Sequence, residues 1–371
     1  MYDQIREDYF FIMIYSAVTT TALMASCYLL FRRGNAFAPD ITPPARLRRW
    51  TAVFLALIAL NHIWYLPLFW LTSDEDVEMA DLVGGLLDCI AIIPLAIALL
   101  IMMLQDRRRP LWPVAVVMAP LIVGSVNSVA TRSYAFLPIA YAYFLLMCIG
   151  LIIYMVRALR QYGSWLRDNY ADLEHKEVWQ SFAILAIMLL VFAAYAFVSE
   201  GPVYQYAMQL ILFVLIYYLL WRVETLSDLS IPDKDAAEDT VSTENVEDNG
   251  LSLSIRHKIG PLLKQHCEEP MLYTQYDLTL SQLAQTIGIN RLYISQYFSS
   301  QGLNYNMYIN GLRIQHFISL YRKATAAHQP ITAQQLAYES GFRSYNTFSV
   351  AFKKIKGMTA TEWMRNIEEK G

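Results

Sequence analysis

The chain repeats one pattern, first as LTLSQLAQTIGINRLYISQYFSSQG (Leu278–Gly302) and again as ITAQQLAYESGFRSYNTFSVAFKKIKG (Ile331–Gly357). The recurring residues are Leu283, Ala284, Gly288, Ile294, Ser295, Phe298 and Gly302 in the first copy and Leu336, Ala337, Gly341, Phe348, Ser349, Phe352 and Gly357 in the second. The offset between counterparts drifts from 53 to 55 residues. The turn in the second copy is therefore predicted to be a residue longer.

Each copy predicts two short helices joined by a tight turn. A Ser or Thr followed three residues later by Glu or Gln reciprocally satisfies free amides at a helix start. The two occurrences of this spacing are Thr279–Gln282 and Thr332–Gln335. Gly288 and Gly341 permit the turn because glycine adopts positive φ without steric penalty. Asn290 and Ser344 are then the expected N-caps of the second helices.

The second helices are expected over Arg291–Phe298 and Tyr345–Lys354. Apolar residues at helical spacing should face inward, namely Ile294, Phe298, Phe348, Ala351, Phe352 and Ile355. The opposite faces are polar and could lie in a DNA major groove. The side chains expected to face bases are Leu292, Ser295, Gln296, Tyr345, Asn346, Ser349 and Val350. Those expected to face phosphates are Asn290, Arg291, Arg343, Ser344, Thr347, Lys353 and Lys354.

Further motifs accompany the two copies. NGLRIQHF, which contains Arg313, bridges them, and GMTATEWMR closes the region. Together with YISQYF, GFRS and TFSVAFKK, these motifs make Leu262–Arg365 similar to the DNA-binding domain of AraC/XylS-type transcription regulators. The resemblance covers under a third of the chain and implies an all-helical domain whose partner is double-stranded DNA. RNA polymerase and a second copy of the chain are open as further partners.

Three positions depart from the family's pattern. Gln296 and Val350 stand where arginine is usual, and Ala360 replaces a common proline. Arginine is best suited to bidentate guanine contacts, so sequence preference should differ or base readout should be weak. An interaction module that does not bind DNA is the alternative interpretation. Charge argues against it, because Leu251–Gly371 holds 13 Lys+Arg against 7 Asp+Glu in a chain of net charge −3.

The N-terminal part reads as a membrane domain. Hydrophobic residues make up 56% of the chain and charged residues 16%, against about a quarter charged in soluble domains. The apolar runs are Tyr9–Phe31, Thr51–Leu71, Leu82–Leu104, Leu111–Ala130, Ala135–Val156, Trp179–Val198 and Pro202–Trp221. Each is long enough to cross ~30 Å of hydrocarbon at 1.5 Å per residue. The expected fold is all-α, with a seven-span bundle over 1–222, a linker over 223–250 and the DNA-binding domain over 251–371.

Basic residues predict the orientation of the spans. Arginines follow the first, third and fifth spans, whereas TSDEDVEMAD, after the second span, has no basic residue. The positive-inside rule then places the N-terminus outside and the C-terminus in the cytoplasm. The expected location is the bacterial inner (cytoplasmic) membrane. The leader MYDQIREDY is net acidic, which favours an anchor over a cleaved signal.

Two polar segments lie between the expected domains or spans. Val223–Gly250 has nine acidic residues and one lysine, so a flexible tether is predicted there. RDNYADLEHKEVW, from Arg167 to Trp179, contains His175, but nothing like an ATP-binding domain follows it. A solvated amphipathic loop helix is favoured over a phosphorylated histidine. The residues of this segment also suit the membrane surface or a docking face.

Polar residues inside the spans are candidates for a sensor pocket, because they are expensive in hydrocarbon and tend to face the interior. They are Asn61, His62, Asp88, Asn127, Gln205 and Gln209. A small molecule or a lipid could provide the signal. The alternative is that these residues only fix helix packing through hydrogen bonds.

No enzyme signature and no metal-ligand spacing is present in the sequence, so neither catalysis nor a cofactor is expected. The four cysteines are interpreted as buried or reduced thiols. The sequence therefore predicts a membrane-bound, one-component transcription regulator with a seven-helix sensor or anchor. The alternatives are a small transporter or channel with a DNA-binding tail, and a structural membrane scaffold.

Overall fold

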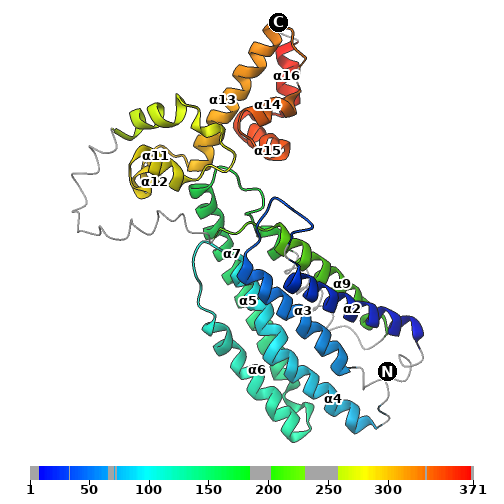
Figure 1. Ribbon diagram of the computed structural model, residues 1–371. Coiled ribbons are helices and arrows are strands. Elements are labelled where there is room, and N and C mark those ends of the chain that lie inside the picture. Colours follow the sequence, from blue (N-terminus) through cyan, green and yellow to red (C-terminus); the bar gives the residue numbers. More distant parts are fainter. Residues whose placement is uncertain are drawn as a thin grey trace, which may run out of the picture. The chain divides into compact units, whose positions relative to one another are not determined.

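A computed structural model describes residues 8–32, 34–65, 71, 73–183, 202–229, 258–330 and 332–368. The secondary structure of these residues is helical apart from one isolated bridge. The chain forms two compact units, and Figure 1 shows their helices. Unit 1 comprises residues 1–162 and 178–230, and unit 2 comprises residues 163–177 and 231–371. Residues 163–177, which the sequence places in the span bundle, group with the C-terminal helices in unit 2.

Unit 1 is a bundle of long apolar helices (Figure 1). Its elements are α2 (Tyr9–Phe31), α3 (Ala45–Tyr65), α4 (Asp74–Leu87), η2 (Asp88–Ile92), α5 (Ile93–Met103), α6 (Trp112–Thr131), η3 (Tyr134–Phe136), α7 (Leu137–Asn169, which continues into unit 2) and α9 (Pro202–Thr225). Among the described residues, five helices are long and apolar enough to cross a membrane: Tyr9–Phe31, Glu75–Met103, Trp112–Thr131, Pro138–Asn169 and Tyr206–Thr225. Most of the expected sixth span, Trp179–Val198, lies outside the described residues.

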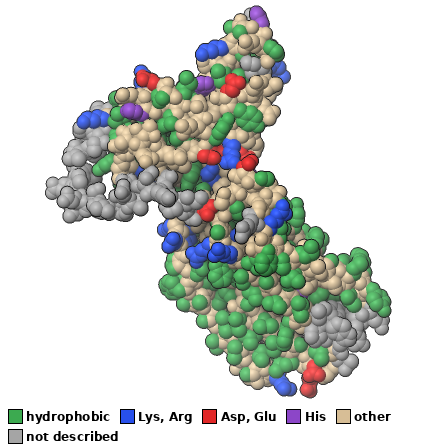
Figure 2. All heavy atoms as spheres, in the orientation of Figure 1, with side chains coloured by type: hydrophobic (Ala, Val, Ile, Leu, Met, Phe, Trp, Pro, Cys, Tyr) green, Lys and Arg blue, Asp and Glu red, His purple; other side chains and the backbone are tan. Residues whose placement is uncertain are grey.

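The surface of unit 1 is rich in apolar side chains. Figure 2 shows hydrophobic side chains over the helices of this unit, and Lys and Arg gather at one end of it. Large side chains such as Met24, Trp112, Val123, Leu146 and Leu210 are exposed. Soluble proteins rarely leave contiguous apolar patches of this kind uncovered, so this surface suits a lipid environment.

Two expected loops of unit 1 are helical. The acidic stretch after the second span forms the start of α4, whose N-cap is Ser73. Acidic residues favour the first turn of a helix because they complement its positive end. This preference explains why the acidic stretch is helical and not the expected loop. Helix α7 continues past the expected end at Val156 to Asn169, so the arginines in that stretch lie on the helix.

A π-helical turn interrupts the third expected span. It covers Asp88–Ile92 and precedes α5, which has Pro94 in its first turn. Proline lacks an N–H and clashes with the carbonyl four residues earlier, so the regular α-helical hydrogen bonds cannot continue through this position. The turn places the one acidic residue of this span, Asp88, at an irregular point of the helix.

The first residues of the expected flexible linker, from Val223 to Thr225, are helical. Helix α9 continues to Thr225, and Val223 and Glu224 are both buried. Arg48 Nε lies 3.0 Å from Glu224 Oε1, so the carboxylate is buried with a paired charge. Residues 230–250, the rest of the expected linker, lie outside the described residues.

Unit 2 contains two short helix pairs joined by a long helix. Residues 258–263 are helical, and η4 (Lys264–Glu268), η5 (Leu272–Thr274), α11 (Leu280–Ile287), α12 (Arg291–Ser300), α13 (Tyr305–Ala326), α14 (Ala333–Glu339), α15 (Tyr345–Lys356) and α16 (Ala360–Glu368) follow. One apolar cluster contains Ile294, Phe298 and Ile309, and the other contains Phe317 and Phe348. Helix α13 contributes to both clusters and therefore connects the two halves of unit 2 (Figure 1).

Arg313 secures this connection from inside the unit. Its side chain is fully buried, and its Nε and Nη2 donate to the carbonyls of Tyr273 and Gln275, each over 2.7 Å. Its guanidinium also lies 5.6 Å from the ring centre of Phe342. Burial lowers the pKa of Arg313, but these acceptors satisfy the buried cation. The arginine of the bridging motif thus fixes the segment in front of the first helix pair.

Candidate nucleic-acid interface

The first helix pair, α11 and α12, has the local geometry that its sequence predicts. The Gln282 N–H donates to Thr279 Oγ1 over 3.2 Å, and the Thr279 N–H donates to Gln282 Oε1 over 2.9 Å. Gly288 ends α11 with φ +72°. Asn290 Oδ1 then accepts from the Leu292 N–H over 2.8 Å at the start of α12. The expected capping box, glycine turn and N-cap are confirmed here.

The second pair, α14 and α15, repeats this arrangement. The Thr332 hydroxyl accepts from the Gln335 N–H, and the Ser344 hydroxyl accepts from the Thr347 N–H, each over 3.2 Å. Gly341 has φ +92°, and a Cβ at this position would lie 2.5 Å from the Cα of Thr274. Glycine is therefore required at the second turn both by backbone conformation and by space.

The inward faces of the second helices follow the sequence pattern with one exception. Ile294 and Phe298 of α12 are buried, as are Phe348, Ala351 and Phe352 of α15. Ile355 was expected to face inward, but it is 39% exposed. The packed cluster ends at Phe352, whose ring lies 5.7 Å from that of Trp363, and the last turn of α15 extends beyond it.

The side chains that the sequence predicts to face bases differ in exposure, and one of them, Tyr345, packs against the apolar cluster of the second pair, with its ring 5.6 Å from that of Phe348. Leu292 is 61% exposed and Val350 is 65% exposed, which leaves two apolar side chains free to meet a partner. Gln296 and Asn346 are also exposed, whereas Ser295, Tyr345 and Ser349 are half-buried. The rows on α12 and α15 thus combine amide, hydroxyl and apolar groups.

The residues expected to face phosphates divide into two groups. Asn290, Arg291, Lys353 and Lys354 are exposed. Arg343, Ser344 and Thr347, at the start of α15, are half-buried and contact acidic groups of the same unit. Arg343 Nη1 lies 3.2 Å from Asp277 Oδ2. The hydroxyls of Ser344 and Thr347 donate to Glu174 Oε2 over 2.6 and 3.0 Å.

Sequence reasoning missed Glu174. It lies 170 residues before Ser344, in the segment that the sequence analysis assigned to the membrane domain. The segment is not the expected loop helix, because α7 ends at Asn169.

The expected sensor residues of unit 1 form two separate pairs. Asn61 Nδ2 donates to Asp88 Oδ1 over 2.7 Å, and His62 Nε2 lies 3.2 Å from Gln209 Oε1. Asn127 lies exposed on α6 and lines neither the cavity beside Asp88 nor the cavity beside Gln209. The side chain of Gln205 lies outside the structural description. Among the described residues of this set, the structure therefore shows two hydrogen-bonded pairs, with Asn127 apart from both.

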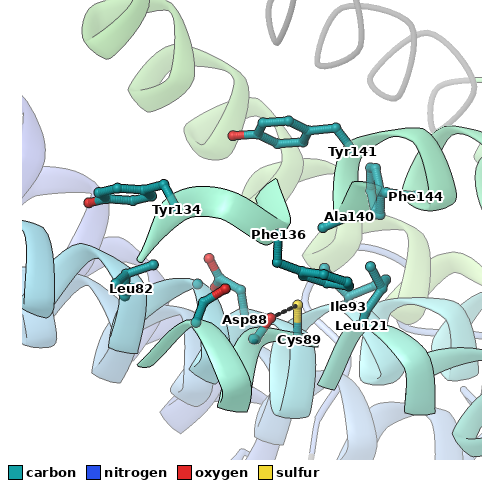
Figure 3. A pocket seen from close by; sticks show the side chains of 13 residues that line it. Leu82, Asp88, Cys89, Ile93, Leu121, Tyr134, Phe136, Ala140, Tyr141 and Phe144 are labelled. Atoms are coloured by element: carbon teal, nitrogen blue, oxygen red, sulfur yellow. Dashed lines mark hydrogen bonds between the residues drawn. The ribbon is translucent and has the colours of Figure 1, made fainter. Parts of the chain in front are cut away.

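Two cavities adjoin these pairs. One measures about 320 Å³ and is lined by Asp88, Cys89, Ser125, Tyr134 and Phe136 among others. In Figure 3, Asp88 and Cys89 lie near the ring of Phe136, and the dashed line marks the Ser125 Oγ–Cys89 Sγ hydrogen bond of 3.7 Å. The other measures about 460 Å³, and its walls are apolar except for Gln209 and the hydroxyl of Tyr206.

The cysteines and other candidate ligands give no sign of a metal centre in the parts of the chain that the structure describes. All four cysteines are free, and Cys148 and Cys267 are buried. Burial raises the pKa of the Cys267 thiol to about 12, which keeps it protonated and unreactive at neutral pH. Cys27 is exposed and free, which agrees with the second alternative of the expected buried or reduced thiols.

Comparisons with known proteins concern unit 2. Residues 283–366 match a family model described as a helix-turn-helix domain. The chain is similar to the TCP pilus virulence regulatory protein of two Vibrio cholerae serotype O1 strains, O395 and N16961, with 31% identity over 75 residues in each case. The aligned residues are 20% of this chain, which spans about a quarter of the length of these curated relatives. No solved structure matches the chain. Residues 283–366 form an AraC-type helix-turn-helix domain.

Proposed function

We propose that this chain is a transcription regulator that is anchored in the cytoplasmic membrane and binds duplex DNA through α12 and α15. The observation that carries the proposal is the pair of capped helices whose outward faces leave Leu292, Gln296, Asn346 and Val350 exposed. The helix-turn-helix match over 283–366 supports DNA as the partner. In such domains the second helix of each pair lies in the major groove, with its N-terminal residues at the bases.

The side chains on these faces suit A·T base pairs. Amides such as Gln296 and Asn346 pair bidentately with the N6 and N7 of adenine, and apolar side chains such as Leu292 and Val350 contact the methyl group of thymine. The predicted base-facing rows contain no arginine, which is the usual partner of guanine. We therefore expect the operator to be rich in A·T pairs at the positions that α12 and α15 reach.

DNA binding is tested with the full chain in lipid nanodiscs and a pool of random duplexes. Lys353→Ala should weaken binding to all sequences about equally and reduce the salt slope by about one unit, because it removes one phosphate contact. Lys264→Ala removes the same charge from an exposed site on η4 and serves as the control. If the wild-type chain has no affinity for any duplex at low salt, the proposed function is wrong.

Unit 1 would hold this regulator in the bilayer. We propose seven spans with the N-terminus outside, supported by five helices of sufficient length and by the arginines near one end of the bundle. A reporter that is active only in the cytoplasm should work when fused after Arg108 or Gly371. The same reporter fused at Ser73, before α4, should be silent, and activity there would reverse the orientation.

Unit 1 also offers a candidate signal site. The cavity beside Asp88 has mostly apolar walls and one carboxylate, so it suits a small apolar molecule with a hydrogen-bond donor or a positive group. Asp88 already accepts from Asn61, and a ligand would share or replace that contact.

A further inference from the structure

A short segment that separates two apolar runs is part of unit 2. Helix α7 ends at Asn169, and residues 170–177 continue as an irregular segment that we call the strap. Ala171 of the strap is 1% exposed and lies in the same apolar cluster as Ile259 and Phe298. The strap is therefore packed into unit 2 rather than left in solvent.

Hydrogen bonds to its backbone hold the beginning of the strap in place. Tyr170 forms an isolated antiparallel bridge with Thr279, the N-cap of α11. On α13, Asn306 Nδ2 donates to the carbonyl of Ala171 over 2.7 Å, and Asn310 Nδ2 donates to the same carbonyl over 3.2 Å. Two side-chain amides thus satisfy a strap carbonyl that burial removes from water.

A turn in the strap positions Glu174. Asp172 Oδ1 accepts from the Glu174 N–H over 3.0 Å, and His175 has φ +62°. Few non-glycine residues adopt this left-handed conformation, although histidine does so more readily than most. Lys176 Nζ lies 3.7 Å from Asp277 Oδ1, which ties the end of the strap to the loop before α11.

The carboxylate of Glu174 occupies the start of α15. It accepts from the hydroxyls of both Ser344, the N-cap, and Thr347, three residues into the helix. The N-terminus of a helix carries partial positive charge and free N–H groups, and it is a common binding site for phosphate. Because Arg343 contacts Asp277, acidic groups of this unit engage all three of the expected phosphate contacts that precede or open α15.

We propose that the strap is an autoinhibitory element that competes with duplex DNA for the N-terminus of α15, an inference that rests on the proposed DNA-binding function. A carboxylate and a DNA phosphate present similar acceptor oxygens to these hydroxyls and to the positive end of the helix. Both cannot occupy the same two hydroxyls at once. With the strap bound, the N-terminus of α15 is closed to the phosphate backbone, and release of the strap opens it.

The strap is connected through the polypeptide chain to unit 1. The 163–177 segment leaves unit 1 after Tyr162 and returns to it at Val178, so both of its ends continue into that unit. Helix α7 lines the Asp88 cavity with Tyr141 and Phe144 and ends where the strap begins. A rearrangement of α7 would therefore act on the strap without an intermediate domain.

The affinity of the full chain in nanodiscs for duplex DNA tests this competition. Glu174→Ala should raise the affinity about 3- to 30-fold, because it removes the acceptor of two charge-assisted hydrogen bonds. Asn306→Ala should also raise it, although no charge changes, because it removes a contact that holds the strap. Glu269→Ala removes the same charge as Glu174→Ala from an exposed position of unit 2 and is the control.

Hydrogen exchange in the wild-type chain gives a second readout. Because it needs no substitution, a change in stability caused by a mutation cannot affect it. Competition is reciprocal, so saturating duplex DNA should speed the exchange of strap amides between Tyr170 and Glu177. A strap that only stabilises the fold would keep or increase its protection when DNA binds. Lys353→Ala, which leaves the strap contacts intact, should require more DNA for the same effect.

These outcomes separate the inference from the proposed function. If duplex DNA binds, but Glu174→Ala and Asn306→Ala change the affinity no more than Glu269→Ala and strap exchange does not speed up, the strap is not a competitor. If no variant binds duplex DNA at low salt, the proposed function itself fails. Faster strap exchange with DNA together with tighter binding of both variants supports the competition.

Discussion

The two helix pairs of unit 2 share one sequence pattern but differ at the start of the second helix. In the first pair, Asn290 and Arg291 are exposed, and the Asn290 side chain caps its own helix. In the second pair, the N-cap Ser344 and Thr347 also donate to a carboxylate from a distant segment. The first pair is thus available to a phosphate backbone while the second is engaged.

This difference distinguishes features that depend on local sequence from features that depend on a distant segment of the chain. Caps, glycine turns and buried faces arise within about twenty residues and repeat in both pairs, because local geometry determines them. The occupancy of the helix start depends on a partner from elsewhere in the chain. Two copies of one fold can therefore differ in whether the start of the second helix is contacted by another segment of the chain.

The largest expected effect concerns the two turn glycines. Gly341→Ala should destabilise the second pair by about 3 kcal/mol or more, because the new methyl would lie 2.5 Å from the Thr274 Cα and φ is +92°. Gly288→Ala meets nothing within 4 Å, so only the positive φ opposes it, at about 1–2 kcal/mol. Local hydrogen exchange of α12 and α15 measures the two losses separately. Equal losses in the two pairs would contradict the steric argument.

Much of unit 2 could be predicted from the sequence because its determinants are local. Thr279, Gln282 and Gly288 act within one or two turns, and the structure has them as expected. The exposed end of α15 at Ile355 could not be read from periodicity, since the same helical face is buried only as far as its neighbours extend.

The side-chain contacts of unit 1 and of the strap could not be predicted from the sequence alone. Polar residues in spans can be found by composition, but the pairing of Asn61 with Asp88 and of His62 with Gln209 depends on how helices pack. The contact of Glu174 with α15 joins residues 170 positions apart, and no local pattern encodes it.

The comparison of the two pairs predicts unequal losses when the base-facing amides are removed. In the wild-type chain, Gln296→Ala should weaken binding to the preferred duplex by about 1–3 kcal/mol, the range of one bidentate base contact. Asn346→Ala should have a smaller effect, because α15 is engaged by the strap. In a Glu174→Ala background the loss caused by Asn346→Ala should increase to the same range.

Titration of each variant with a preferred duplex and with a duplex altered at single base pairs measures these losses. Ser299→Ala changes an exposed residue on the same helix as Gln296 and is the control, since its hydroxyl bonds to the carbonyl of Ser295. An Asn346→Ala loss that is the same with and without Glu174 would show that the second pair is already open.

The next comparison is between the Asp88 cavity and the DNA-binding surface. Asp88→Asn keeps an acceptor for Asn61 but replaces the carboxyl group that lines the cavity. If the site receives a signal, this variant should reach normal membrane levels but hold target-gene output in one state. A shift of about 1 kcal/mol between two states changes output roughly fivefold.

Membrane abundance and reporter output are measured together for this variant. Asn127→Ala lies on the same bundle but lines neither cavity, so it should leave both unchanged. Reduced abundance or thermal stability, with the surviving protein still responsive, would favour the packing role of Asp88. A responsive variant of normal abundance would contradict both roles.

The smallest expected effect is a pH dependence of strap binding. Burial raises the pKa of the Asp172 carboxyl above its ordinary value of 3.8, although the Lys176 ammonium partly offsets this. A raised pKa in the bound strap means that protonation favours the bound state. The contribution is present below the ordinary pKa and is lost as the pH rises through the raised one.

Asp172→Asn imitates the protonated carboxyl and keeps the Oδ1 acceptor for the Glu174 N–H. At neutral pH this variant should therefore hold the strap slightly more tightly and bind DNA slightly more weakly than the wild-type chain, by less than about 1 kcal/mol. The difference between the two proteins should shrink as the pH falls toward the raised pKa, because wild-type Asp172 then becomes neutral. DNA titrations at several pH values measure this difference, with Glu269→Gln as the control for loss of an exposed carboxylate. Weaker strap protection in Asp172→Asn at neutral pH would mean that the attraction between the charged Asp172 and Lys176 outweighs the unfavourable burial of the carboxylate.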